Sequence, residues 1–134
     1  MLNVEIVTPE KIVFDSEVDY VSVPTASGEI GILPSHAPLV SKLSAGILTC
    51  SLKSRSERFA ISGGFLEVNS DKVSVLAEYA VTSDDVSLEA ARAEKEAAET
   101  ELDQKSADDK DVEDLLRKIQ FAEAKMLLAK SDGA

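Results

Sequence analysis

The chain has 134 residues, 44% of them hydrophobic and 29% charged, and its 14 basic and 25 acidic side chains give a formal net charge of −11. This length suits one domain, or one domain with an appendage. The negative charge disfavours nucleic acid and anionic lipid headgroups as partners. No run of residues approaches the ~18 consecutive apolar positions that span a bilayer.

A single cysteine, Cys50, excludes an internal disulfide. The first residues lack the pattern of a signal or transit peptide, so we expect a reducing, cytoplasmic compartment.

From Leu2 to Val81 the sequence has the period-two alternation of β-strands. Turn residues punctuate it at spacings near ten residues, as at Gly63-Gly64 and Asn69–Lys72, the second of which predicts a hairpin turn. Besides the strand that begins at Leu2, the candidates are Ile12–Asp15, Glu29–Leu33, Ala37–Leu43, Ile47–Lys53, Arg58–Ser62, Phe65–Asn69 and Val73–Ala77. Roughly eight to ten such strands predict a β-sandwich or a flattened barrel. No crossover helix fits between them, so a parallel α/β sheet is disfavoured.

One segment of this half, residues 27–49, contains the only histidine, His36, together with two glycines and two prolines in a dozen residues. Gly28 and Gly31 can adopt positive φ, whereas Pro34 and Pro38 fix φ and remove a backbone donor. These residues predict a stiff, shaped loop at a sheet edge. Such loops often bind partners, but a set of purely structural turns explains the same residues.

From Ser87 onwards the pattern becomes helical. Residues 87–105 are rich in Ala and Glu and lack Gly and Pro, and Ser87 is a good N-cap for this first helix. After a polar break, in which Asp108 or Asp109 can cap the next helix, a second helix is predicted over Val112–Lys130. Two helices with a short connection form an αα-hairpin. We therefore expect an α+β protein, with a sandwich of about ten strands over residues 1–86 and an antiparallel helical hairpin over residues 87–134.

The apolar stripes of the two helices differ in size. The stripe of the first helix consists mostly of small side chains, namely Leu88, Ala91, Ala98 and Leu102. That of the second helix contains Val112, Leu115, Ile119, Ala122 and Met126, with Leu116 and Leu127 at its flanks. An alanine-rich seam buries little area, so we expect a hairpin that associates weakly, docks weakly on the sandwich and can move.

Catalytic chemistry is missing from the sequence. One His and one Cys, far apart, make no metal-binding pattern. Ser35 precedes His36, but neighbours in a proline-bounded turn rarely face each other and no acid lies at a telling distance. The glycines lack the G-K-[ST] continuation of a phosphate loop. Asp84-Asp85 is better explained by turn and cap chemistry than by acid–base catalysis. We expect no catalytic residues and no metal site.

Charge is segregated within the predicted hairpin. Residues 87–114 hold four cations against eleven acids, a net charge of −7, whereas residues 115–130 hold four cations against one acid, a net +3. The excess cations are Arg117, Lys118, Lys125 and Lys130. Cations near a helix C-terminus are favoured by the helix dipole, and this is the commoner explanation. The sharper hypothesis is a basic helix that seeks an acidic surface.

Taken together, these segments resemble a known family. G-E-I-G-I-L-P-S-H-A-P-L at residues 28–39, I-S-G-G-F-L-E-V at Ile61–Val68, the strand V-S-V-L-A-E-Y-A and the terminal hairpin look like the epsilon subunit of F-type ATP synthase. The resemblance extends in order over essentially the whole chain. It implies a bacterial-type, non-catalytic rotor subunit without a cofactor, which couples rotation of the membrane ring to ATP synthesis, and whose hairpin restrains ATP hydrolysis.

The resemblance also implies partners and contact residues. The expected partners are the gamma subunit of the central stalk, the membrane c-ring and, transiently, the catalytic alpha/beta ring. The ring-contact candidates are Ser27, Gly28, Glu29, Ile30 and His36, and the inhibitory-contact candidates are Arg117, Lys118, Lys125 and Lys130. The expected location is peripheral, on the cytoplasmic face of a bacterial cell membrane, with the thylakoid membrane as the alternative.

Some members of the family bind ATP on the hairpin through an [IL]-D-x-x-R-A motif and further arginines. Here Glu89 replaces the motif's Asp and Arg92 is kept, but Glu99 and Phe121 stand at two of the arginine positions and Lys125 at another. Loss of cations removes charge-assisted bonds to phosphate, so we expect weak or absent ATP binding.

Two other functions remain open from the residues alone. A stand-alone ligand-binding sandwich with a helical interaction appendage explains residues 1–86, though not the charge-segregated hairpin. A small hydrolase lacks the residues for its chemistry.

Overall fold

The computed structural model describes residues 1–35 and 37–132 of the chain. Ten strands precede a 3-10 turn and two helices. The elements are β1 (Leu2–Val7), β2 (Ile12–Val18), β3 (Tyr20–Thr25), β4 (Gly28–Ile32), β5 (Leu39–Leu43), β6 (Gly46–Leu52), β7 (Arg55–Ile61), β8 (Gly64–Asn69), β9 (Lys72–Ala77), β10 (Ala80–Val81), η1 (Ser83–Asp85), α1 (Leu88–Asp103) and α2 (Val112–Asp132). The predicted α+β class is confirmed.

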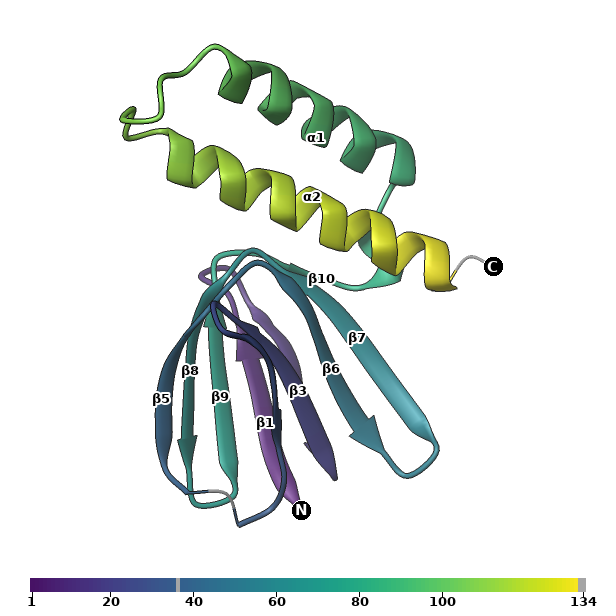
Figure 1. Cartoon of the computed structure of the whole chain (residues 1–134). Coiled ribbons are helices and arrows are strands. Elements are labelled where there is room, and N and C mark those ends of the chain that lie inside the picture. Colours follow the sequence, from purple (N-terminus) through teal and green to yellow (C-terminus); the bar gives the residue numbers. More distant parts are fainter. Residues whose placement is uncertain (36, 133–134) are drawn as a thin grey trace.

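The strands form one sheet that folds over on itself. Hydrogen-bonded neighbours follow the order β10-β7-β6-β3-β5-β8-β9-β1-β2, and β4 pairs with β3. Every pairing is antiparallel except that of β1 with β9, which is parallel. Among the described residues, Thr25–Leu43 is the only pair that joins β3 to β5, so the sheet divides there into the two layers of a sandwich (Figure 1).

The core lies between the two layers and is made of alternate residues of each strand. On β1, for example, Leu2, Val4 and Ile6 have no exposed surface, whereas Asn3 between them is exposed. Phe14 of β2 and Phe59 of β7 meet edge to face across the core, with ring centroids 5.3 Å apart. This contact joins β2, at one end of the sheet order, to β7, which lies next to the strand at the other end.

Several predicted strand bounds needed correction: β2 runs on to Val18 and β7 begins at Arg55, earlier than the predicted Arg58. The strand predicted from Ala37 begins at Leu39, because Pro38 has no N–H to donate to a ladder. The strand predicted over Val73–Ala77 ends where β9 ends, but the longer segment V-S-V-L-A-E-Y-A of the family resemblance is broken at Glu78-Tyr79 into β9 and β10. The break is stabilised by Ser62, whose hydroxyl accepts a hydrogen bond from the Tyr79 amide at 3.0 Å.

The glycines act in different ways. Gly28, Gly63 and Gly64 have positive φ, but Gly31, predicted to be able to do so, does not. Gly31 is required instead by a close approach, because the ring of Tyr20 lies where its Cβ would be.

The hairpin lies across the end of the sandwich opposite the N-terminus, with α2 between α1 and the strands (Figure 1). Ser87 caps α1 as predicted, accepting a hydrogen bond from the Ala90 amide at 3.2 Å. Asp85 likewise acts in a cap, accepting bonds from the amide and hydroxyl of Thr82. The two helices pack through their small residues, with Ala91, Ala98, Leu115 and Ala122 all buried.

A second buried face of α2 was not predicted. Ala124 and Leu128 pack on Ala60 of β7, together with the half-buried Ile47 of β6 and Val86. Leu128 and Ala60 are completely buried. By contrast, Leu116 and Leu127, which were predicted to flank the helix–helix stripe, are exposed. Helix α2 is therefore sandwiched between α1 and the β-strands and is apolar on two faces.

Candidate functional site

The first candidate site is the β3–β4 turn, which presents three of the predicted ring-contact residues. Gly28 closes the turn with φ +115°, and its carbonyl accepts a hydrogen bond from the Thr25 hydroxyl at 2.5 Å. Ser27, Gly28 and Glu29 are exposed, whereas Ile30 is half-buried and packs against the core. The Glu29 carboxylate accepts a hydrogen bond from the hydroxyl of Ser22, which is itself buried. Glu29 thus has a fixed position on the strand surface.

The remaining ring-contact candidate, His36, lies outside the described residues. Its neighbour Ser35 lies at the far end of β4 from the β3–β4 turn, where its amide donates to the Asp71 carboxylate at 2.7 Å. The backbone carbonyl of Asp71 in turn accepts from the amide of Asn3. Within the described residues β4 pairs only with β3, so its other edge is free along the whole span between the two turns.

The second candidate site is the set of α2 cations, of which Arg117, Lys118 and Lys125, but not Lys130, line one groove. Arg117 pairs with Asp114 one turn earlier at 3.3 Å, and Lys125 pairs with Glu94 of α1 at 2.7 Å. Lys118 and Lys130 are exposed. Lys118 and Lys125 are seven residues apart and share a side of the helix, whereas Lys130 points elsewhere.

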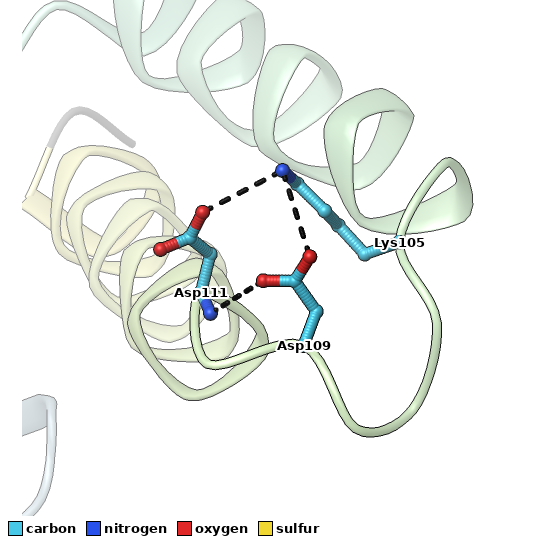
Figure 2. A network of polar contacts seen from close by, with 3 residues as sticks. All are labelled: Lys105, Asp109 and Asp111. Carbon is cyan, nitrogen blue, oxygen red and sulfur yellow. Dashed lines mark hydrogen bonds and ion pairs between the residues drawn. The ribbon is translucent and has the colours of Figure 1, made fainter.

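Ion pairs connect the two helices along their length. Lys95 of α1 lies 3.4 Å from Glu123 of α2, close to the Lys125–Glu94 pair. At the connection, Lys105 lies 3.9 Å from Asp109 and 3.5 Å from Asp111 (Figure 2). Asp109 also accepts from the amide of Asp111 at 2.9 Å. This bond closes a turn just before α2 and reaches no amide of the helix itself, so the capping role predicted for Asp108 or Asp109 stays a prediction. Ion pairs, as well as the packing of buried alanines, therefore hold the two helices of the hairpin together.

A groove of about 750 Å³ lies between the hairpin and the end of the sandwich, beside the contacts that join them. Ser62 and Tyr79 border it from the strands, and Ala98, Leu115 and Phe121 from the helices. Its charged lining is mixed, with the acids Glu78, Glu94, Glu101 and Asp114 and the cations Arg117, Lys118 and Lys125. A groove with acids in excess is a poor site for phosphate.

The two α1 residues of the expected ATP motif lie apart from this groove, whereas Phe121 and Lys125 of α2 line it. Glu89 and Arg92 are exposed on α1 and do not line the groove. Phe121 stacks on Tyr79, with ring centroids 6.2 Å apart and planes inclined by 19°. The ammonium of Lys125 lies 4.6 Å from the centroid of the Phe121 ring. The α2 residues at these positions therefore contact other parts of the chain.

The partners of Phe121 and Lys125 in this region, Tyr79 and Glu94, were not predicted. The i, i+4 spacing of Phe121 and Lys125 signals a ring and a cation on one helix face. No sequence pattern indicates that Tyr79, some 42 residues before Phe121, comes to lie beside it.

The described part of the chain contains no arrangement suited to metal chemistry, since residues 1–35 and 37–132 hold no group of three His, Cys, Asp or Glu side chains able to bind an ion. Burial raises the pKa of the Cys50 thiol to about 12, helped by the negative charge of Glu57 on β7. Cys50 is accordingly a packed thiol within the core. Neither described helix combines the length and the hydrophobicity needed to cross a bilayer.

Comparison with known proteins explains this architecture. A family model described as the beta-sandwich domain of the ATP synthase delta/epsilon chain matches residues 1–83. The ATP synthase epsilon chain of Desulforamulus reducens is 45% identical over 106 residues, 79% of this chain and 80% of that protein. That of Moorella thermoacetica is 46% identical over 102 residues, 75% of this chain and 76% of that protein. This chain belongs to the ATP synthase epsilon-chain family.

Solved structures share the fold of this epsilon-chain family member over almost its whole length. A chain in the mitochondrial ATP synthase of Euglena gracilis, solved as OSCP/F1/c-ring, has a TM-score of 0.75 at 23% identity and covers 97% of this chain, which covers 81% of that one. A chain in the central stalk/c-ring of the Tetrahymena thermophila mitochondrial enzyme has a TM-score of 0.65 at 14% identity, with 99% and 96% covered. The family model stops before the hairpin, but the shared fold includes it.

Proposed function

We propose that this epsilon chain is a non-catalytic rotor subunit in the central stalk of a proton-transporting ATP synthase. The observation that carries the proposal is the identity of about 45% with bacterial ATP synthase epsilon chains over three quarters of the chain. In this assignment residues 1–86 couple rotation of the membrane c-ring to ATP synthesis, and residues 87–134 regulate ATP hydrolysis. The subunit is peripheral, on the cytoplasmic face of the cell membrane.

A rotor part must transmit torque without deforming, and the sandwich suits this role. Close-packed interiors have low compressibility. Contacts such as the one between Phe14 and Phe59 tie strands from the two ends of the sheet order together.

The proposed contact with the c-ring uses the free edge of β4. Glu29 is exposed there, and its hydrogen bond from Ser22 reduces the entropy lost when a partner binds the carboxylate. Basic or hydrogen-bonding loops of the ring are suitable partners for this group.

The proposed contact with the gamma subunit uses an apolar patch on the outer face of β5, β8 and β9. Phe65 and Leu76 are register partners, and Val40 lies on the same face of β5; these three side chains are 57%, 56% and 74% exposed. Exposed apolar patches mark protein interfaces. This patch borders a second groove of about 570 Å³ that extends to Arg117.

The proposed inhibition requires the hairpin to leave the sandwich and bring its cations to the catalytic alpha/beta ring. Each exposed ion pair contributes only about 0.2–1 kcal/mol, so several cations have to act together. A docked state a few kcal/mol from an extended state permits such a switch.

Purification of the tagged full-length chain from its native membranes tests the proposal. We expect a large membrane-associated ATPase to co-purify in stoichiometric amount. Recovery of the chain alone, under conditions that keep the rest of the enzyme assembled, would exclude the rotor assignment and favour a stand-alone binding protein.

A further inference from the structure

Four side chains join α1, α2 and the sandwich in one continuous row of contacts. Glu94 of α1 pairs with Lys125 of α2, Lys125 lies over the ring of Phe121, and Phe121 stacks on Tyr79 of the sandwich. Helix α1 otherwise packs on α2, and α2 on β6 and β7 (Figure 1). The row is therefore a link through which both helices are fastened to the strands.

Lys125 is the centre of this row. Its side chain is 15% exposed, much less than the 56% of its partner Glu94, and its ammonium is 2.7 Å from the carboxylate and 4.6 Å from the ring centroid. Partial burial weakens screening by solvent, so this pair is stronger than an ordinary surface pair. A cation over an aromatic face adds a further attraction.

Tyr79 provides a fixed attachment point on the sandwich. It lies in the break between β9 and β10, where its amide donates to the Ser62 hydroxyl at 3.0 Å and its carbonyl accepts from the Ser62 amide at 3.1 Å. Both bonds hold the backbone of Tyr79 against the end of β7. The aromatic stack consequently connects the hairpin to a point of the sandwich whose backbone is held by two hydrogen bonds.

We propose that Glu94, Lys125, Phe121 and Tyr79 form a latch that holds the hairpin on the sandwich without a bound ligand. In this latch the carboxylate of Glu94 neutralises a cation that a ligand anion would otherwise bind. The second part of the proposal rests on the proposed function: Lys125 exchanges Glu94 for an acidic partner only after the latch opens, so closing the hairpin also withdraws this cation.

Hydrogen exchange of the isolated full-length chain, followed by mass spectrometry, tests the latch directly. We expect Lys125→Met and Tyr79→Ala to accelerate exchange of α1 and α2 about three- to tenfold, with strands β1 and β9 unchanged as an internal measure of folding. Lys130→Met is the matched control, because Lys130 is an exposed lysine on the same helix. Tyr79→Phe retains the ring, so hydrogen exchange of its two helices should be as slow as in the original chain.

Equal exchange of the helices in Lys125→Met and Lys130→Met would overturn the latch. So would a tenfold slowing of helix exchange by millimolar ATP in the original chain, because the closed hairpin would then depend on a ligand. The charge-swapped pair, Glu94→Lys with Lys125→Glu, gives an independent criterion. It should recover at least half of the protection that Lys125→Glu alone loses, and no recovery would also count against the ion pair.

The exchange of partners is tested in the assembled enzyme with Glu94→Gln. This variant weakens the latch but keeps the cation, so we expect ATP hydrolysis to fall about two- to threefold. The isolated Glu94→Gln chain should show faster hydrogen exchange of its helices. If it does, and ATP hydrolysis by the enzyme that carries it is nevertheless unchanged, Lys125 does not change its partner as proposed. The hydrogen-exchange results on the isolated chain would still stand, so failure of the latch and failure of the inhibitory role are distinguishable.

Discussion

The buried hydroxyl of Ser22 on β3 donates a hydrogen bond to the carboxylate of Glu29 on β4, so the acid nearest the β3–β4 turn is held by its own sheet. We expect Glu29→Lys to weaken the coupling of proton flow to ATP synthesis, because it reverses the charge on the proposed ring-contact edge. Loss of the hydrogen bond should lower the free energy of unfolding by only about 0.5–1.5 kcal/mol. ATP-driven proton pumping in membrane vesicles and the melting temperature of the isolated chain measure the two effects.

Glu96→Lys makes the same charge change on an exposed position of α1 and is the control for coupling. Glu29→Gln retains an acceptor for Ser22 and should keep the original melting temperature. Normal pumping with Glu29→Lys would show that Glu29 is merely a solubilising acid.

Removal of residues after Val86 should leave the sandwich folded and coupling intact and raise ATP hydrolysis. The main core is built from residues of the strands, and no residue of the hairpin belongs to it. Truncation exposes Ala60 and Ile47, which α2 covers, so a modest loss of stability is expected. Thermal unfolding and hydrolysis assays at several salt concentrations measure these outcomes, and equal hydrolysis at every salt concentration would make the hairpin a purely structural element.

Charge reversal should separate the four α2 cations into two groups. Lys118→Glu and Lys130→Glu should relieve inhibition without changing hairpin stability, because both side chains are exposed. Arg117→Glu and Lys125→Glu should also destabilise the hairpin, since they place an acid beside Asp114 or Glu94. Lys110→Glu, in the connection between the helices, is the control. High salt should partly relieve inhibition in the original chain, and identical hydrolysis in all five variants would refute the electrostatic contact.

Isothermal titration should detect weak or no binding of ATP to the full-length chain. Phe121 and Lys125 already contact Tyr79 and Glu94, and Glu99 on α1 adds a negative charge where the related motif has a cation. A dissociation constant below about 10 μM, roughly −7 kcal/mol, would contradict this. Phe121→Arg with Glu99→Arg should increase affinity, which tests whether the missing cations are the cause.

The thiol of Cys50 should resist alkylation in the folded chain up to strongly alkaline pH, because its pKa is about 12. Since the folded pKa lies above the unfolded value, the folded state keeps a proton that the unfolded state loses, and stability should fall as pH rises above about 9. Cys50→Ala should flatten this alkaline decline at the cost of a small cavity. Maleimide labelling and unfolding curves between pH 7 and 10.5 provide the measurements.

Much of the architecture follows from local sequence patterns. Period-two alternation, turn residues such as Asn69–Lys72 and the cap at Ser87 act over a few residues, so the strands, the β8–β9 hairpin and both helices can be predicted from them. The start of β5 after Pro38 and the short strand β10 after Glu78-Tyr79 are harder to predict; the break before β10 is stabilised by a hydrogen bond that the Tyr79 amide donates to the distant Ser62.

The α+β class, the order of strands before helices and the motifs of the family resemblance can all be read from the amino-acid sequence. The burial of α2 on two faces, the bond between Ser22 and Glu29, and the position of Lys125 between Glu94 and Phe121 become visible only in the folded chain. The difference lies in the sequence separation of the interacting residues. Helix and strand periodicity depends on neighbours a few residues apart, whereas these contacts join side chains that only the folding of the sheet and the docking of the hairpin bring together.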